Sequence, residues 1–196
     1  MFTGIIQGLG QIIDNTDGIF KIETKLNLEN CNNGSSISCN GVCLTLIDIK
    51  KHNDQYIFSV NIGEETMNRT IYKNRIQSNK INLEKSLTIG DEIGGHFVYG
   101  HIDCVTKITK ILNLNNSWEF NFEKNFNNNN LLVVEKGSIS INGISLTIAK
   151  VEKEYFTISI IPHTFNNTNL KFAEENDLVN VEFDYLARYL LNKNEK

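Results

Sequence analysis

Two segments of the chain repeat nearly the same sequence but differ at a residue that could do chemistry. Residues 36–49 read "SISCNGVCLTLIDI", and residues 138–151 read "SISINGISLTIAKV". Cys43 in the first segment aligns with Ser145 in the second, 102 residues further on. A thiol and a hydroxyl at equivalent places predict nucleophilic or proton-handling chemistry, or contact with a ligand. The competing interpretation of Cys43 is a small buried hydrophobe, as for most free cysteines.

Each repeated segment also carries a threonine two residues later, Thr45 in the first and Thr147 in the second. Residues two apart on a β-strand point to the same side of the sheet. Each segment therefore presents a polar strand face, although threonine is also simply a common strand residue. Two similar polar faces in one chain predict that it binds two similar ligands.

Other polar residues could support such chemistry. His96 and His101 flank "FVYG", a spacing that does not bring two rings together on a strand or loop, so we expect no metal pair. One of them is better suited to an acid–base or orienting role, since histidine titrates near neutral pH. From its position alone, Lys136 is interpreted as a solvated lysine. Asp184 is interpreted as the N-cap of a C-terminal helix.

The cysteine pattern and the short motifs exclude several classes of protein. Cys31, Cys39, Cys43 and Cys104 form no C-x-x-C pair and lack histidine partners at zinc-finger spacing. They predict no structural zinc and reduced thiols in a cytoplasmic protein. The chain also has no GxGxxG, P-loop, GxSxG or HExxH motif, which argues against the nucleotide-binding, hydrolase and zinc-protease classes that carry them.

Composition points to an ordinary globular protein. Of the 196 residues, 21% are charged and 40% hydrophobic, which is enough apolar material for a core. The formal charge of −4 is spread along the chain, which argues against nucleic acid or an anionic membrane as the main partner. We expect no secretory signal and no membrane-spanning helix, since the N-terminus lacks a basic region followed by an apolar core and no apolar run approaches about 20 residues.

Further matches in the same order extend the repeat to the whole chain. "EETMNRT" resembles "PHTFNNT", and "INLE" resembles "VNVE". Near the start, "FTGIIQG" is aligned with "GGHFVYG", which pairs Gly8 with Gly100. The spacing changes only between matches, as is typical of insertions in surface turns. We therefore predict a duplicated domain, with halves at residues 1–96 and 97–193 and a boundary within "GDEIGGHF".

Each half is predicted to consist of β-strands. Asn-Gly in both repeated segments is the strongest short hairpin signal. "YIFSVNI" and "YFTISII" are rich in β-branched and aromatic residues. Pro162, the only proline, is expected to end a strand because it cannot donate to a sheet. The asparagine run over residues 127–130 is expected to be a loop.

Only the tail, "DYLARYLLNKNEK", is predicted to be helical, over residues 185–193 or so. Leu186, Tyr189 and Leu190 recur there at helical spacing. A short helix with one apolar face needs a surface to pack on. In a chain of this kind, another subunit would provide that surface.

Four motifs, "MFTGIIQG", the pair "NGVCLT" and "NGISLT", "EIGGHFVYGHID" and "IPHT", resemble those of the α-type riboflavin synthases of the lumazine-binding family. The resemblance covers nearly the whole chain, in the same order and with the same doubling. It implies an all-β fold of two duplicated six-stranded Greek-key β-barrels followed by a short C-terminal helix. It also implies a homotrimer, in which the N-terminal barrel of one subunit meets the C-terminal barrel of its neighbour to form the active site.

The resemblance further implies a transferase reaction, the last step of riboflavin biosynthesis. Two molecules of 6,7-dimethyl-8-ribityllumazine undergo a dismutation in which one donates a four-carbon unit to the other, giving riboflavin and 5-amino-6-ribitylaminouracil. No cofactor or metal is implied, and each barrel binds one lumazine. The implied partners are the small-molecule substrate, other copies of the chain and lumazine synthase, with no nucleic acid and no membrane. The C7 methyl of the lumazine is acidic because its anion delocalises into the ring. Most of the rate is therefore expected from orientation, and modest acid–base help should supply the rest.

Position by position, the resemblance implies six residues at or near the reaction centre, which are Phe2, Thr3, Cys43, His101, Ser145 and Asp184. Cys43 and Ser145 are expected to handle protons or position the nucleophile, and His101 and Asp184 to orient groups or act as acid or base. The implied N-barrel pocket comprises Gly4, Ile5, Ile6, Cys43, Leu44, Thr45, Asn61, Ile62, Gly63, Glu64, Glu65 and Thr66. The implied C-barrel pocket comprises Gly100, His101, Ile102, Lys136, Ser145, Leu146, Thr147, Ser159, Ile160, Ile161, Pro162, His163 and Thr164.

The chain departs from the family pattern at a few places. Val42 precedes Cys43 where some members have a second cysteine, His163 stands where glutamate is common, and Tyr99 replaces a small residue. The tail after Asp184 is short, which bears on how a trimer would pack. None of these departures removes a residue expected to take part in the chemistry.

Two alternatives compete with an enzyme. The first is a relative of the same fold that binds a lumazine or a flavin without turnover. Such relatives lose polar residues in one of their two pockets, whereas both halves here keep a Leu-Thr pair after Cys43 or Ser145. The second is a structural β-protein in which the repeat merely doubles a stable module.

Overall fold

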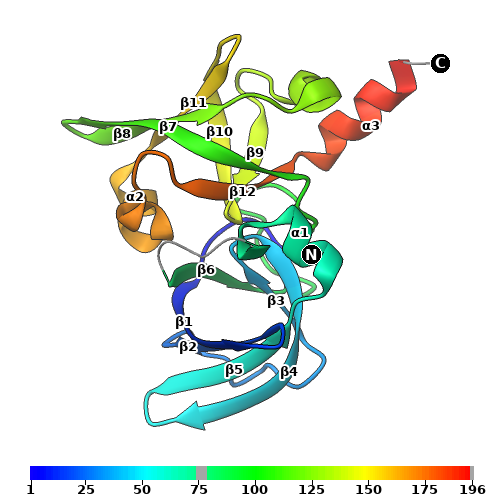
Figure 1. The fold of residues 1–196 in the computed structure, drawn as a ribbon, viewed down its shortest axis with the longest axis vertical. Coiled ribbons are helices and arrows are strands. Elements are labelled where there is room, and N and C mark those ends of the chain that lie inside the picture. Colours follow the sequence, from blue (N-terminus) through cyan, green and yellow to red (C-terminus); the bar gives the residue numbers. More distant parts are fainter. Residues whose placement is uncertain (74–78, 195–196) are drawn as a thin grey trace.

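The computed structural model describes residues 1–73 and 79–194 and contains two β-barrels stacked along the long axis of the molecule (Figure 1). The N-terminal barrel lies below and the C-terminal barrel above in that view. Each barrel is closed by six antiparallel strands. The prediction of an all-β chain with two six-stranded barrels is therefore confirmed.

The strands of the two barrels follow the same order. Around the first barrel the order is β1-β2-β5-β4-β3-β6, and the second repeats it as β7-β8-β11-β10-β9-β12. The first barrel comprises β1 (Gly8–Thr16), β2 (Ile19–Thr24), β3 (Ser36–Cys39), β4 (Val42–His52), β5 (Gln55–Asn61) and β6 (Lys80–Lys85). The second comprises β7 (Cys104–Leu114), β8 (Ser117–Glu123), β9 (Ser138–Ile141), β10 (Ile144–Val151), β11 (Tyr155–Ile160) and β12 (Leu178–Phe183).

The repeated segments form the β3–β4 and β9–β10 hairpins, as the Asn-Gly signal predicts. The turn residues have φ of 48° at Asn40 and 82° at Gly41, and 47° at Asn142 and 80° at Gly143. Positive φ at both turn residues is typical of the two-residue turns that match the twist of paired strands. Strand alternation then sends Leu44 and Leu146 into the two barrel cores, while Cys43 and Ser145 point outward.

The tips of these two hairpins meet back to back and join the barrels. A Cβ placed on Gly41 would lie 2.6 Å from the Gly143 amide nitrogen, so the backbones are in direct contact. Buried asparagines complete the junction. The Asn180 side chain accepts a hydrogen bond from the Ile71 amide at 2.9 Å and donates to the Asn40 carbonyl at 2.9 Å. The two barrels are therefore joined by buried hydrogen bonds between asparagine side chains and backbone groups.

Replacing Asn180 with alanine should lower the free energy of unfolding by about 3 kcal/mol, because two buried backbone groups lose their partners. Thermal and denaturant unfolding would measure the change. Asn113→Ala, an exposed position near the tip of the β7–β8 hairpin, is the matched control and should cost less than about 0.5 kcal/mol. Equal stability of the two variants would show that the Asn180 hydrogen bonds do not contribute to the free energy of unfolding.

The tail forms α3 (Tyr185–Asn194), in agreement with the predicted helix. The Asp184 carboxylate accepts a hydrogen bond from the Leu186 amide at 2.9 Å, which confirms it as an N-cap. Ala187 and Leu191 pack on the C-terminal barrel. Leu186, Tyr189 and Leu190 remain 65–68% exposed, so the apolar face predicted from their spacing is not covered within one chain.

The prediction that only the tail is helical was wrong. Two six-residue helices, α1 (Glu64–Arg69) and α2 (Pro162–Asn167), follow β5 and β11, and each is followed by a 3₁₀ turn, η1 (Ile71–Lys73) and η3 (Asn169–Phe172). They are too short to show a period in the sequence. Pro162 ends β11 as expected and also starts α2, where its fixed φ suits the first helical turn. The asparagine run expected as a loop forms the 3₁₀ turn η2 (Asn127–Leu132). None of the described helices is long and apolar enough to cross a membrane.

Candidate active site

The residues around Cys43 and Ser145 come from two segments that cross between the barrels. We call residues 1–6 the N-terminal arm and residues 94–102 the linker arm. The Gly4 carbonyl accepts a hydrogen bond from the Ser145 amide at 2.8 Å, and the Gly100 carbonyl accepts one from the Cys43 amide at 2.9 Å. Each arm therefore lies along the hairpin of the barrel that belongs to the other half of the sequence.

This crossing corrects two expectations. Gly4, Ile5 and Ile6 were grouped with Cys43, but the structure places Gly4 against Ser145; Gly100 was grouped with Ser145 but lies against Cys43. The alignment of Gly8 with Gly100 was also wrong, because Gly8 is the first residue of β1 and not part of an arm. Gly4, with φ of 75°, is the structural counterpart of Gly100, with φ of 82°. An alignment of the two halves by residue type missed this because it has no information on which barrel an arm reaches.

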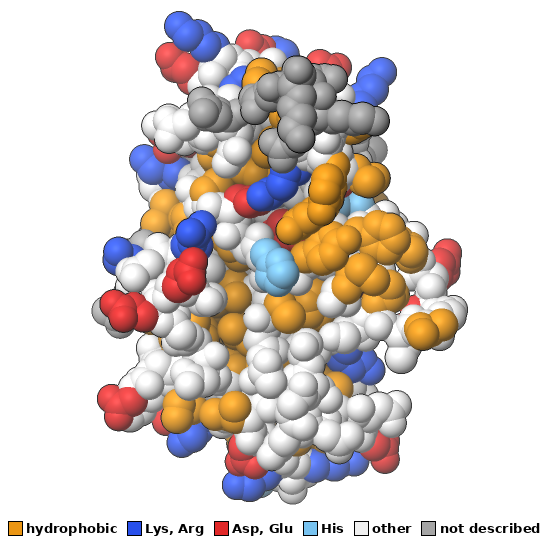
Figure 2. Space-filling model, turned by 90° about the vertical axis from the view of Figure 1, so that its right-hand side faces the viewer, with side chains coloured by type: hydrophobic (Ala, Val, Ile, Leu, Met, Phe, Trp, Pro, Cys, Tyr) orange, Lys and Arg blue, Asp and Glu red, His pale blue; other side chains and the backbone are white. Residues whose placement is uncertain are grey.

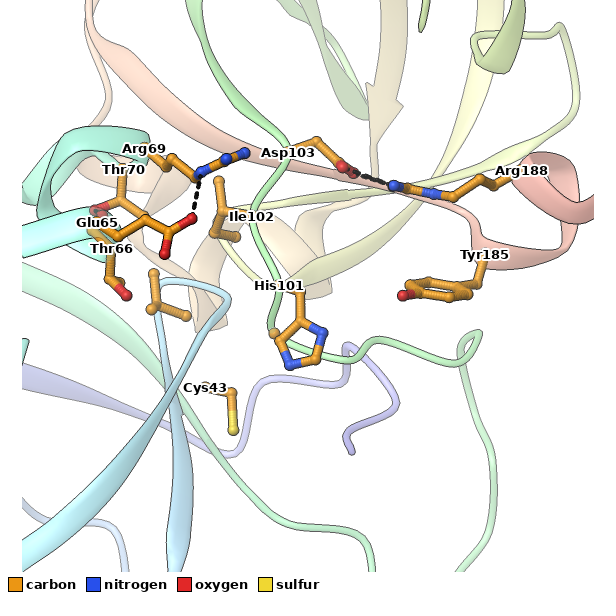
Figure 3. A pocket seen from close by; sticks show the side chains of 12 residues that line it. Cys43, Glu65, Thr66, Arg69, Thr70, His101, Ile102, Asp103, Tyr185 and Arg188 are labelled. Atoms are coloured by element: carbon orange, nitrogen blue, oxygen red, sulfur yellow. Dashed lines mark hydrogen bonds and ion pairs between the residues drawn. The ribbon is translucent and has the colours of Figure 1, made fainter. Parts of the chain in front are cut away.

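A cavity of about 420 Å³ opens beside Cys43, between the two barrels (Figure 3). Cys43 of β4 and Thr66 of α1 line it together with His101 and Ile102 of the linker arm, which were grouped with Ser145 instead. Tyr185 and Arg188 of α3 close the side opposite α1. The other lining residues are Val42, Glu65, Arg69, Thr70, Gly100 and Asp103.

The charged groups of this cavity are paired. Arg188 Nη2 lies 2.6 Å and 2.7 Å from the two Asp103 carboxylate oxygens, and Arg69 Nε lies 3.3 Å from the Glu65 carboxylate (Figure 3). The Arg188 guanidinium also lies over the Tyr185 ring, 5.1 Å from its centroid. The cavity therefore offers hydrogen-bonding groups and an aromatic face, which suits a neutral polar heterocycle better than an ion.

Ser145 is hydrogen-bonded to His96, which was not among the six residues expected at the reaction centre. His96 Nδ1 lies 2.7 Å from Ser145 Oγ, and the His96 amide donates to the Thr3 carbonyl at 3.2 Å. Burial lowers the pKa of His96, and the Asp184 charge opposes this effect in part. His96 is thus a neutral imidazole at pH 7, able to accept a proton at one nitrogen while it holds one at the other. Sequence reasoning singled out the His96 and His101 pair but favoured His101.

The thiols differ sharply in environment. Burial raises the pKa of Cys39 far above its usual range and that of Cys104 to about 12, so both are kept as neutral thiols. The competing interpretation of a buried hydrophobe fits Cys39, which is fully buried, better than Cys43, which lines the cavity. Among the described residues, no group of three or more His, Cys, Asp or Glu could hold a metal ion.

Strand alternation places some of the remaining predicted site residues in the barrel cores and others on the surface. Ile62 and Ile160 point into the barrel cores with Leu44 and Leu146, so their side chains do not reach a surface site. Phe2 is fully buried and pairs with Val98, which joins the two arms. His163 hydrogen-bonds to Asn167 within α2. The exposed members are Ile5, Thr45, Asn61, Gly63, Glu64, Glu65, Lys136, Thr147, Ser159, Ile161, Pro162 and His163.

The two barrels with their doubled arms and hairpins define a class of duplicated-barrel proteins that one family model describes. The family model described as "Lumazine binding domain" matches the chain twice, over residues 3–86 and 99–184. Each match spans one barrel together with the part of an arm that directly precedes it.

Full-length relatives narrow the class. The chain is 39% identical to a riboflavin synthase of Chlamydia muridarum, covering 96% of this chain and 92% of the relative. It is 35% identical to that of Actinobacillus pleuropneumoniae, covering 97% and 88%. The chain belongs to the riboflavin synthase family. Among solved structures, LumP complexed with riboflavin has a TM-score of 0.78 at 26% identity, covering 93% of this chain and 99% of that one.

Proposed function

We propose that this chain is a transferase that converts two molecules of 6,7-dimethyl-8-ribityllumazine into riboflavin and 5-amino-6-ribitylaminouracil. The atoms of two substrates equal those of the two products, so the reaction needs no other reactant. The observation that carries the proposal is the doubled site, in which Cys43 and Ser145 each lie against an arm glycine in the same hydrogen-bonded geometry. Two copies of one substrate call for two copies of one site, one on each barrel, with each arm supplied by the other half of the sequence.

Deprotonation of the C7 methyl is best supported on the Ser145 side. A neutral imidazole, His96, is hydrogen-bonded there to a hydroxyl, and Asp184 stabilises the imidazolium that forms when a proton arrives. The proton leaves the methyl carbon for Ser145 Oγ while the hydroxyl proton passes to His96, and the carbanion delocalises into the lumazine ring. Positioned acid–base groups of this kind contribute about 10²–10⁴-fold in rate.

The Cys43 side is suited to hold the second lumazine. Its cavity of about 420 Å³ has an aromatic wall in Tyr185 and hydrogen-bonding groups in Thr66 and His101. These groups fix the ring so that its reacting carbon faces the carbanion. Holding two reactants in register converts a bimolecular step into an effectively unimolecular one, which supplies a large part of the rate.

Turnover tests the proposal directly. Purified protein incubated with 6,7-dimethyl-8-ribityllumazine should develop riboflavin fluorescence and consume two substrates for each riboflavin formed. Binding of the lumazine without turnover would instead identify a non-catalytic binder, as would a stoichiometry other than two to one.

Assembly into a homotrimer in the cytoplasm completes the proposal. The four cysteines are free, which is consistent with a reducing compartment. Hydrophobic side chains gather on the face seen from the side of α3 (Figure 2). Exposed Leu186, Tyr189 and Leu190 give α3 an uncovered apolar face, and a neighbouring subunit would cover it. In that arrangement the N-terminal barrel site of one subunit meets the C-terminal barrel site of the next.

Leu190→Glu is expected to weaken this assembly and to lower activity at the same time, because a charge on the α3 face would be buried between subunits. Sedimentation and riboflavin formation, measured over a range of protein concentrations, should fall together. Leu114→Glu, at the tip of the β7–β8 hairpin, is the matched control and should change neither. A monomeric Leu190→Glu protein with full activity would rule out a site shared between subunits.

A further inference from the structure

Each barrel ends in a strand that carries a buried glutamate, in the "INLE" and "VNVE" repeat that the chemistry above does not use. Glu84 of β6 is 2% exposed, and Glu182 of β12 is 1% exposed. Within residues 1–73 and 79–194 neither carboxylate forms an ion pair with Lys, Arg or His. A buried carboxylate without a cation is costly unless its oxygens accept several hydrogen bonds.

The hydrogen bonds come from the two arms. Glu182 Oε1 accepts from the Tyr99 amide at 2.6 Å, and Oε2 accepts from the Gly100 and His101 amides at 2.8 Å and 3.1 Å. Three consecutive backbone N–H groups thus surround one carboxylate. Because Gly100 has a positive φ, its amide and those of its neighbours converge as in an anion-binding nest.

Glu84 does the same for the N-terminal arm. Its Oε1 accepts from the Thr3 amide at 2.8 Å and from the Thr3 hydroxyl at 2.9 Å, and its Oε2 accepts from the Gly4 amide at 3.0 Å. The same arm glycines also contact the residues assigned to the reaction. The Gly4 carbonyl accepts from the Ser145 amide, and the Gly100 carbonyl accepts from the Cys43 amide. A single arm glycine therefore links each glutamate to the strand that carries a reactive side chain.

We propose that Glu84 and Glu182 are positioning residues for the proposed dismutation, each holding through consecutive backbone amides the arm that completes the site on the opposite barrel. The inference rests on the proposed function. Glu182 sets His101 and the linker arm over Cys43, and Glu84 sets Thr3 and the N-terminal arm beside Ser145. Neither carboxylate touches substrate, and each acts through the position of an arm.

Ionisation of Glu182 should control this anchoring. Burial raises the pKa of Glu182 to about 7, the amides of Tyr99 and Gly100 oppose this, and the Asp103 charge adds to it. Arg188, which is paired with Asp103, also acts electrostatically on Glu182. The neutral Cys104 thiol lies on the neighbouring strand β7, and Tyr99 and His101 carry ionisable side chains on the arm that binds the carboxylate. A protonated carboxyl is uncharged and carries a hydrogen on one oxygen, so it accepts the three amide hydrogen bonds more weakly than the carboxylate does.

As pH falls from 8 to 6, kcat is expected to decrease while the Glu182 contribution to stability increases. Below pH 7 Glu182 takes up a proton and releases part of the linker arm, so kcat should fall about 10-fold between pH 8 and pH 6. The folded-state pKa is above the unfolded value, so the folded state binds this proton more tightly, and the Glu182 contribution to stability increases as pH falls from 8 to 6. A group that acted only on folding would move stability without moving kcat.

Glu182→Gln separates the two effects. A glutamine of the same shape must turn its NH₂ group toward an arm amide in either orientation, so one side of the nest is lost at every pH. We expect a kcat about 10–100-fold lower at pH 8, a KM within about 3-fold of the wild type, and a loss of the step between pH 8 and pH 6. Glu84→Gln should lower kcat by a similar factor through the other arm. Asp177→Asn, which removes a carboxylate that accepts the Glu174 amide in an exposed turn, is the matched control.

Amide hydrogen exchange gives a readout that does not depend on turnover. The amides of Tyr99, Gly100 and His101 should exchange faster in Glu182→Gln than in the wild type at pH 8, and the wild type should approach the variant at pH 6. Unchanged kcat, unchanged exchange or an unchanged pH step in Glu182→Gln would each overturn the positioning role. If Glu182→Gln fails to fold, Glu84→Gln and the wild-type exchange profile decide in its place. A wild type without turnover would overturn the proposed function, and the exchange profile would then show whether the anchoring itself exists.

Discussion

Replacing Ser145 with alanine is expected to lower kcat about 100-fold while changing the free energy of unfolding by less than about 1 kcal/mol. The hydroxyl is hydrogen-bonded to His96 Nδ1 at 2.7 Å, and Ser145 is only partly buried, so its loss leaves little cavity behind. Riboflavin formation measures the rate, and thermal unfolding measures the stability. Thr109→Ala, an exposed hydroxyl bonded to the Asn121 carbonyl on the outside of the same barrel, should keep both.

A double-mutant cycle would show whether Ser145 and His96 act as one unit. His96→Gln should lower kcat by a similar factor, and the double variant should be little slower than either single variant, because groups that share one proton transfer are strongly non-additive. Cys43→Ala should have the smaller effect, since no histidine is hydrogen-bonded to Cys43 in the part of the chain that the structure describes. Wild-type activity in both Ser145→Ala and Cys43→Ala would refute the site as assigned.

The barrels and their hairpins were within reach of the sequence because they depend on local signals. Asn40-Gly41 and Asn142-Gly143 specify tight turns by their backbone preferences alone, and the apolar alternation after each turn sets which side chains face the core. Repetition of both signals predicts two copies of one architecture. The Asp184 cap and α3 are likewise local, since a capping carboxylate and a helical spacing lie within a few residues of each other.

The crossing of the arms was beyond the sequence because it depends on contacts between distant residues. The Gly4 carbonyl meets an amide 141 positions away, at Ser145, and nothing near either residue specifies the other. The glutamates at the ends of "INLE" and "VNVE" appeared only as a repeat, since the backbone amides that they bind leave no mark in residue type. His96 was recognised as one of a pair, but only geometry shows which histidine reaches Ser145.

Gly100→Ala should lower kcat/KM at least 100-fold, because it moves the linker arm away from Cys43. A Cβ at this position would lie 2.5 Å from Cys43 Cβ and 2.6 Å from its amide nitrogen, and φ of 82° adds backbone strain of about 1 kcal/mol. Neither atom can move away easily, because the amide nitrogen is backbone and Cβ is bonded directly to the backbone at Cα. Displacement of the arm breaks the Cys43 hydrogen bond and loosens the nest around Glu182.

Gly34→Ala is the control that separates strain from displacement. Gly34 also has a positive φ, of 90°, but a Cβ there would meet nothing within 4 Å. It should therefore show the same cost in backbone strain, about 1 kcal/mol in the free energy of unfolding, with kcat/KM close to that of the wild type. If Gly100→Ala lost no more activity than Gly34→Ala, the contact between the linker arm and Cys43 would be dispensable for the reaction. A loss of kcat/KM confined to Gly100→Ala would place the reaction where the linker arm meets the N-terminal barrel, because only this variant disturbs the contact with Cys43.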